Sequence, residues 1–202
     1  MQNLIAPWKH WLHWQTLLIG ALFGMVGSVT LWADMRIPLV PQLNIAADVR
    51  EIFVVVGAWY TGPIGGLLAG AISALYSPIG QPALHISTWV AHAMAGLALG
   101  LAYSTKTDRL SGINFVLTWA RAVLTYYLVL LVTLGLCFSL LAPSFLKMVA
   151  GPEGTLLQGW LTLVSSALPE MGFVFLITVI GFMALPKKYR KPIWNVDKPT
   201  NT

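Results

Sequence analysis

The chain has 202 residues, of which 57% are hydrophobic and only 9% are charged. Soluble domains carry about 25% charged residues, so this composition predicts an integral membrane protein in contact with the lipid bilayer. The formal net charge is +5, but the densest basic cluster, residues 187–191, directly follows an apolar segment, which is typical of a cytoplasmic membrane flank and argues against nucleic acid as a partner.

Residues 1–14 are predicted to form an amphipathic segment at the membrane interface. Three tryptophans, Trp8, Trp11 and Trp14, recur there at roughly helical spacing beside Lys9 and two histidines. Indole rings prefer the headgroup level of a bilayer, and no short apolar run with a cleavage site follows. An aromatic docking surface for a partner is the alternative interpretation.

Six apolar segments follow and predict an all-α integral membrane protein with a domain over residues 15–186. They cover residues 15–33, 48–61, 63–77, 86–104, 113–142 and 157–185. The second and third segments meet at Gly62-Pro63 and reach only about 21 to 23 Å, whereas the hydrocarbon core is about 30 Å thick. Such short helices need shelter from longer neighbours or leave water-accessible space, which is how membrane proteins form binding cavities.

The connection between the first two segments is not expected to span the membrane. It contains Pro38, Pro41, Gln42 and Asn44, and so many breakers rule out a spanning helix. Such a connection is instead expected to cap a cavity.

Loop charges predict that both termini are cytoplasmic. With six spans, the side that holds the termini and the basic tail at residues 187–202 carries most of the lysines and arginines. The opposite side receives only Arg36, Arg50 and Lys147. By the positive-inside rule, the chain is expected in the plasma or inner membrane with Arg50 toward the extracytoplasmic face.

Charged residues within or beside these segments are the first candidates for a ligand-binding site. A charge inside the bilayer costs roughly 2.5–3.5 kcal/mol, so it needs a partner, a cavity or a proton. The planar guanidinium of Arg50 suits a carboxylate or phosphate, although Arg50 could instead pair with an acidic neighbour. Asp48 is either a ligand-binding group or a helix N-cap, and Arg121 could pair with Glu170. The candidates at this point are Asp48, Arg50, Glu51 and Glu170.

The sequence offers no catalytic, cofactor or metal-binding set. The single cysteine, Cys137, can form neither an internal disulfide nor a CxxC motif. His85 and His92 are one heptad apart and share a helix face, but they are too far apart to chelate a metal without further ligands. Because no phosphate-binding loop or activated nucleophile is found either, we expect neither enzymatic activity nor a cofactor.

Small residues four apart form stripes on three segments. Such stripes allow membrane helices to approach closely, because contact between them depends on packing. They predict packing within the chain, and the alternative is a docking surface for another subunit or for a second copy in a homodimer. The stripes consist of Gly20, Gly24 and Ser28; of Gly66, Gly70 and Ala74; and of Gly96 and Gly100.

One region of the chain resembles a known family. It begins with Asp48-x-Arg50, continues through an apolar helix to Gly62-Pro63 with Gly66 and Gly70, and ends with Tyr76 and a small-residue helix at 87–100. This region is similar to the five-transmembrane receptor domain of LytS-type sensor histidine kinases, and the resemblance runs from about residue 20 to residue 184. It implies a sensor that binds a small extracytoplasmic ligand and signals through a phosphorelay.

The chain also departs from that family. Many members carry a basic pair after the glycine-rich helix, where this sequence has Tyr76-Ser77. The resemblance therefore adds Tyr76 to the site and implies that Arg50 acts together with Ser77, His85 or Thr88. No kinase module fits after Pro186, so we expect a stand-alone domain that acts through a separate kinase. The alternative is the substrate-binding S component of an energy-coupling factor transporter, which would dock transporter subunits.

Overall fold

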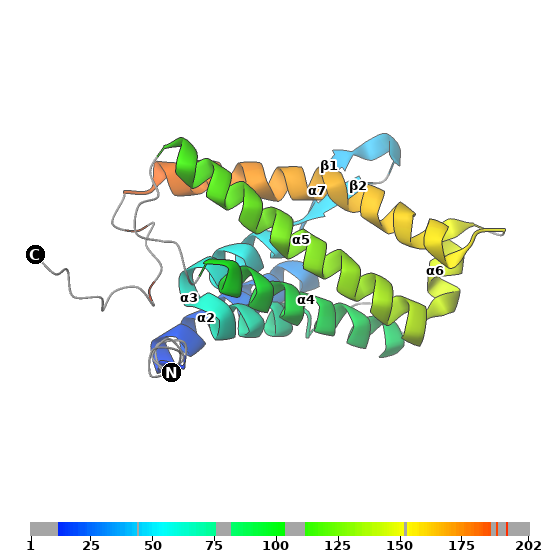
Figure 1. Ribbon diagram of the computed structural model, residues 1–202, viewed down its shortest axis with the longest axis horizontal. Helices are drawn as coiled ribbons and strands as arrows, with labels where there is room; N and C mark the ends of the chain where they lie inside the picture. The colour runs from blue at the N-terminus through cyan, green and yellow to red at the C-terminus, as the bar shows by residue number, and fades with distance from the viewer. Residues whose placement is uncertain are drawn as a thin grey trace, which may run out of the picture.

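The computed structural model describes residues 12–43, 45–75, 82–103, 112–151 and 153–186, together with Tyr189 and Ile193. The predicted interfacial segment and the basic tail therefore lie mostly outside the described residues. Five helices in the described ranges are long and apolar enough to cross a membrane, so the predicted transmembrane helix bundle is confirmed. The helices are α2 (Trp14–Trp32), α3 (Arg50–Ser73), α4 (Pro82–Tyr103), α5 (Ile113–Leu141), α6 (Pro143–Ala150) and α7 (Leu156–Ala184) (Figure 1).

Helix α3 contains both of the predicted short segments and is bent back on itself. Gly62 has φ 71° and ψ −162°, a conformation that is favourable only for glycine. Pro63 then starts the second half, where it needs no N–H donor. The halves pack together, because a β-carbon at Gly57 would lie 3.2 Å from that of Ala69. The break predicted at Gly62-Pro63 is confirmed, and the chain enters and leaves α3 at the same end.

Helices α2 and α4 enclose the α3 hairpin through the predicted small-residue stripes. At one end of the hairpin, Gly27, which neighbours the predicted stripe without belonging to it, also packs closely: a β-carbon there would lie 3.0 Å from the Ser73 β-carbon and 3.2 Å from the Arg50 γ-carbon. Stripe glycines meet opposing backbone so closely that no β-carbon fits, and the stripes therefore serve packing within the chain. These contacts join Gly20 to Gly65, Gly66 to Gly96, Gly70 to His92, and Gly100 to Gly62.

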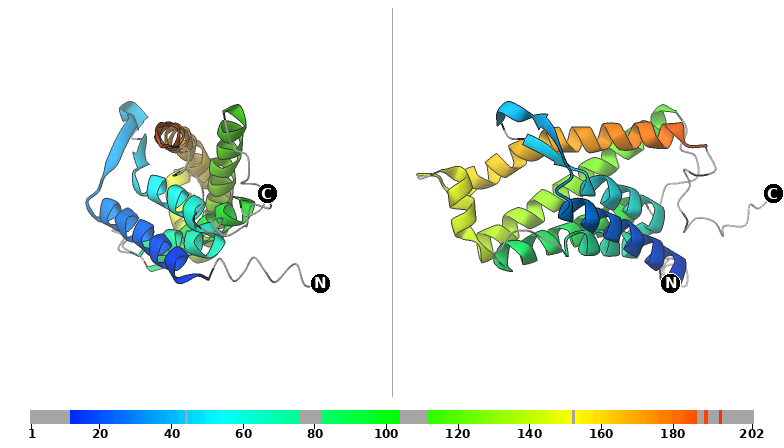
Figure 2. Two further views of the ribbon diagram at one scale, coloured as in Figure 1. Left: turned by 90° about the vertical axis from the view of Figure 1, so that its left-hand side faces the viewer. Right: turned by 180° about the vertical axis from the view of Figure 1, so that it is seen from behind.

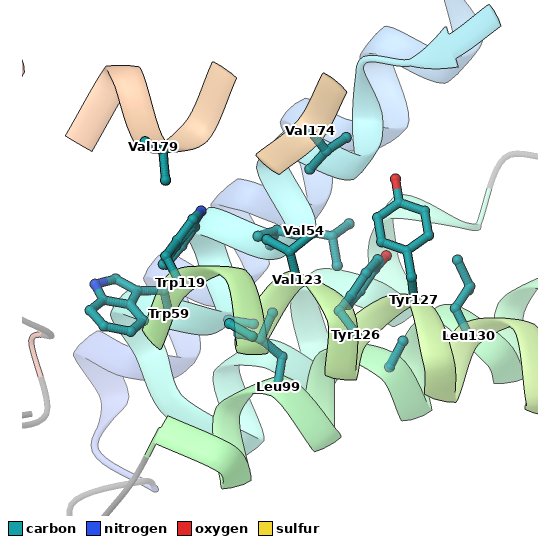
Figure 3. Packing of buried hydrophobic residues seen from close by; sticks show 14 of the residues in the cluster. Val54, Trp59, Leu99, Trp119, Val123, Tyr126, Tyr127, Leu130, Val174 and Val179 are labelled. Atoms are coloured by element: carbon teal, nitrogen blue, oxygen red, sulfur yellow. The ribbon is translucent and has the colours of Figure 1, made fainter. Parts of the chain in front are cut away.

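Helices α5 and α7 complete the bundle, and α6 joins them. An aromatic cluster links both helices to α3: the rings of Trp59 and Trp119 are 4.9 Å apart, and the Trp119 indole N–H donates to Thr178 Oγ1 at 2.7 Å (Figure 3). Helix α2 begins and α7 ends at the same end of the bundle (Figures 1 and 2). The chain runs the length of the bundle in α2, α4, α5 and α7, whereas α3 turns back to the end where it began. The start of α2 and the end of α7 therefore lie at one end, as the six predicted segments required.

A two-stranded hairpin that was not predicted replaces the irregular connection before α3. Strand β1 (Arg36–Val40) pairs antiparallel with β2 (Ile45–Asp48), and Arg36 lies opposite Asp48. A short 3₁₀ helix, η2 (Pro41–Leu43), forms part of the turn. Because β2 leads directly into α3, this hairpin brings Asp48 and Arg50 back into the bundle.

Candidate functional site

A cavity of about 400 Å³ lies between the β hairpin and helices α3 to α7. Ligand-binding cavities commonly measure about 300–1,000 Å³, so this one can hold a small molecule. Its apolar wall consists of Leu130, Leu131, Leu134, Phe138, Phe145 and Leu163, with Ile45, Ala46 and Ala167 beside them. Its polar lining consists of Arg36, Asp48, Arg50, Glu51, Thr88, His92, Tyr127, Ser166 and Glu170.

Arg50 is the centre of the charged lining and is only 7% exposed. Its Nη2 atom lies 3.1 Å from Asp48 Oδ2 and 3.0 Å from Glu51 Oε1. Asp48 Oδ1 also accepts the backbone N–H of Arg50 at 2.9 Å. The N-cap position of α3 is Val49, but Asp48 still satisfies the first N–H of the helix, so Asp48 both holds the start of α3 and pairs with Arg50.

Glu51 collects donors from three helices and is 2% exposed. Besides Arg50, its carboxylate contacts His92 Nε2 at 2.8 Å and accepts the hydroxyl of Tyr126. A buried carboxylate is tolerated only when such donors replace its lost hydration. The three elements α3, α4 and α5 are therefore joined at one carboxylate.

Both ring nitrogens of His92 face acceptors. Nδ1 lies 2.7 Å from the carbonyl oxygen of Thr88, four residues earlier on α4, and Nε2 faces Glu51. A carbonyl oxygen can only accept, so Nδ1 carries a proton. Nε2 lies 2.8 Å from Glu51 Oε1, so His92 is the α4 partner of that carboxylate.

Glu170 approaches this network from α7. Its Oε1 atom accepts the backbone N–H of Asp48 at 2.8 Å. In the described part of the chain no basic side chain forms an ion pair with Glu170. Arg121 is exposed on α5 and is not its partner. The ion pair between Arg121 and Glu170 that the sequence left open is therefore not formed.

The charged network lies deeper than the sequence suggested. His92, Tyr126 and Glu170 lie near the middle of α4, α5 and α7 respectively. The expected location was the mouth of the second segment, at one membrane face. The difference arises because β2 carries the chain back into the bundle before α3 begins.

Two buried polar atoms beside the cavity have no hydrogen-bond partner among the described residues. They are Nε of Arg50 and the hydroxyl of Tyr127, a residue that is 1% exposed. Figure 3 shows the Tyr127 hydroxyl pointing away from α5. An unsatisfied buried polar group costs about 1–3 kcal/mol, so a molecule that supplied partners here would gain free energy.

Burial also changes the acidity of Asp48, which lies on β2, outside the membrane-spanning helices. Desolvation raises the pKa of its carboxyl above the ordinary value, and the neighbouring Arg50 guanidinium opposes that rise. Asp48 therefore takes up a proton more readily than an exposed aspartate does.

The structure brings most of the predicted candidates together. Asp48, Arg50, Glu51, Thr88 and Glu170 all line the cavity. His85 is half-buried on α4 and is not among the lining residues. It lies one turn before Thr88, which lines the cavity. Tyr76 and Ser77 lie outside the described residues.

Sequence reasoning missed Arg36, Tyr126 and Tyr127, and it noted His92 only as a packing or hydrogen-bonding residue. The two tyrosines are adjacent phenols in the middle of a long apolar segment, where a buried hydroxyl needs a partner. The position of Tyr126 in an apolar segment was therefore the signal in the sequence that its hydroxyl forms a hydrogen bond. Arg36 carried no such signal, since only the strand pairing places it beside Asp48.

A bundle of five helices that are long and apolar enough to cross a membrane defines a multi-pass membrane protein. A family model described as the 5TMR of 5TMR-LYT matches residues 4–152. The chain belongs to this family of LytS-type five-transmembrane receptor domains, and its role is that of a membrane sensor. No curated protein and no solved structure matches the chain significantly. The family match ends before α7, so Glu170 lies outside the matched residues.

Proposed function

We propose that the protein is a receptor that binds a small ligand in the cavity beside Arg50 and passes this event to a separate signalling protein. The observation that carries the proposal is a pair of buried polar atoms, Arg50 Nε and the Tyr127 hydroxyl, that lack partners among the described residues and lie beside a cavity of about 400 Å³. The family membership supports the signalling part, because its members are receptor domains.

The α3 hairpin supports a route from the cavity to the other end of the bundle. Arg50 and Glu51 begin the hairpin at the cavity, and Gly62 forms its tip beside Gly100, near the end of α4. With the termini placed in the cytoplasm by the positive-inside rule, this tip faces the cytoplasm. Binding at Arg50 would then be read by a kinase or another phosphorelay protein near the tip.

The transporter alternative receives less support from the packing. The stripe on α2 suggested a docking surface for transporter subunits, but Gly20 and Gly24 face Gly65 and Ala69 inside the chain. Copurification separates the two functions. Capture of a kinase or response regulator supports sensing, whereas capture of an ATPase pair with a transmembrane coupler supports transport.

Ligand binding is tested by thermal unfolding of the protein in nanodiscs against small carboxylates, amines, peptides and vitamins. We expect at least one class to raise the Tm of the wild type, and this shift to shrink in Arg50→Lys. Since any change at Arg50 disturbs Asp48 and Glu51, Tyr127→Phe serves as the second variant, because its hydroxyl has no partner. A screen without hits, or hits unchanged in both variants, would refute binding at this cavity.

A further inference from the structure

We propose that the cavity selects a protonated amine that carries an apolar body, such as an arylalkylamine, over a small carboxylate. This inference rests on the proposed receptor function and names the ligand class of the same cavity. It follows from three observations: the charges of the lining, the unpartnered polar atoms, and the separation of polar and apolar walls.

The positive charges of the lining are already engaged by carboxylates of the chain. Arg50 pairs with both Asp48 and Glu51. At the rim, Arg36 Nε lies 2.9 Å from Asp34 Oδ1. A free carboxylate would enter a space that already holds the three carboxylates of Asp48, Glu51 and Glu170.

Glu170 is the lining carboxylate that takes part in none of these pairs. One of its oxygens accepts the Asp48 N–H, and its other oxygen has no partner among the described residues. An ionised carboxylate away from bulk water is stabilised by an opposite charge within about 4–6 Å. A protonated amine can supply that charge and has three N–H groups to donate.

The unpartnered atoms point independently to a bound molecule. Tyr127 and Arg50 are both more than nine-tenths buried, both line the cavity, and the Tyr127 hydroxyl and Arg50 Nε lack partners in the described part. The Tyr127 hydroxyl can accept from an ammonium group, and Arg50 Nε–H can donate to an oxygen of the ligand. A hydroxyl or carbonyl next to the amine would therefore add to the affinity.

The rest of the cavity requires an apolar body. Leu130, Leu134 and Phe138 of α5, Phe145 of α6 and Leu163 of α7 line its apolar part. The rings of Phe138 and Phe145 are 5.1 Å apart and meet edge to face, an arrangement that accepts a further aromatic ring. A purely polar amine would leave this wall uncovered.

The test compares four probes of matched size or charge: 2-phenylethylamine, 3-phenylpropionate, 2-phenylethanol and ethylamine. Affinity is measured by calorimetry with the whole chain in nanodiscs at pH 7, with empty nanodiscs subtracted. We expect 2-phenylethylamine to bind at least tenfold more tightly than each of the other three. Glu170→Gln should reduce its affinity at least tenfold, because glutamine keeps the acceptor for Asp48 N–H but loses the charge.

Glu153→Gln makes the same chemical change at an exposed position outside this cavity and should leave binding unchanged. If Glu170→Gln fails to fold, Phe138→Leu provides the second variant and should weaken 2-phenylethylamine without affecting ethylamine. Preferred binding of 3-phenylpropionate, or amine binding that survives both variants, would overturn this inference but not the receptor function. No binding by any of the four probes would also overturn it, whereas the broad ligand screen alone decides the receptor function.

Discussion

The Glu170 carboxylate accepts the backbone N–H of Asp48, a residue 122 positions earlier, at 2.8 Å. This bond joins α7 to the point where the β hairpin becomes α3. Asp48 in turn holds the first N–H and the guanidinium of Arg50. One carboxylate from the last long helix thus helps to position the charged start of the α3 hairpin.

Glu170→Ala should destabilise the protein, whereas Glu170→Gln should not. Alanine leaves the part-buried Asp48 N–H without its acceptor, which costs about 1–3 kcal/mol, while glutamine retains a carbonyl oxygen at the same place. Thermal unfolding in detergent measures the difference between the two variants. Equal Tm values for alanine and glutamine would show that the hydrogen bond contributes nothing.

Glu51→Gln should be among the most destabilising polar substitutions in the chain. It removes the negative charge that pairs with the Arg50 guanidinium, and breaking a buried ion pair costs about 3–5 kcal/mol. Asp34→Asn is the matched control, because the Asp34–Arg36 pair is exposed and such pairs contribute about 0–1 kcal/mol. A Tm loss of similar size in both variants would contradict the central position of Glu51.

The adjacent tyrosines of α5 should respond differently to the same substitution. The Tyr126 hydroxyl donates to Glu51, so Tyr126→Phe should cost about 1.5–3 kcal/mol, the usual range for a hydrogen bond to a charged group. The Tyr127 hydroxyl is buried and has no partner in the described part of the chain, so Tyr127→Phe should leave the unliganded protein unchanged or more stable. Thermal unfolding of both variants tests this contrast, and a larger loss at Tyr127 would refute it.

Alanine at Gly70 should separate α3 from α4. Its β-carbon would overlap the His92 carbonyl oxygen, and overpacking of this kind costs about 1–3 kcal/mol. Gly172→Ala provides the control on α7, because nothing lies within 4 Å of a β-carbon there. That control should be neutral or up to about 1 kcal/mol more stable, since alanine favours a helix over glycine. Thermal unfolding of both variants in the same detergent measures the two effects. A Tm loss in Gly172→Ala as large as that in Gly70→Ala would contradict the prediction.

Local sequence signals predicted the elements of this fold well. The length and apolar character of α2, α4, α5 and α7 are visible in the chain, and Gly62-Pro63 marks the break in α3. The strands β1 and β2 were missed, because two short strands with a proline in one of them lack a clear alternating pattern. Helix α6 (Pro143–Ala150) was not predicted, because it is only eight residues long and lies between the fifth and sixth apolar segments.

The site was only partly predictable, because its geometry depends on contacts between distant residues. A charge in an apolar segment indicates that a partner exists, and on this basis Arg50, Glu51 and Glu170 were selected. The identity of the partner depends on helix packing. The contact between Glu51 and His92 is formed because Gly70 lets α4 approach α3, and no single segment contains that information.

The glycine faces of the α3 hairpin have a mechanical consequence. Where Gly66 meets Gly96, and where Gly20 meets Gly65, the contact is made by backbone without intervening side chains. Each of these contacts leaves no room for a β-carbon, so a lengthwise shift would bring a neighbouring side chain into space that only glycine can occupy. The contacts therefore hold the hairpin in register with α2 and α4.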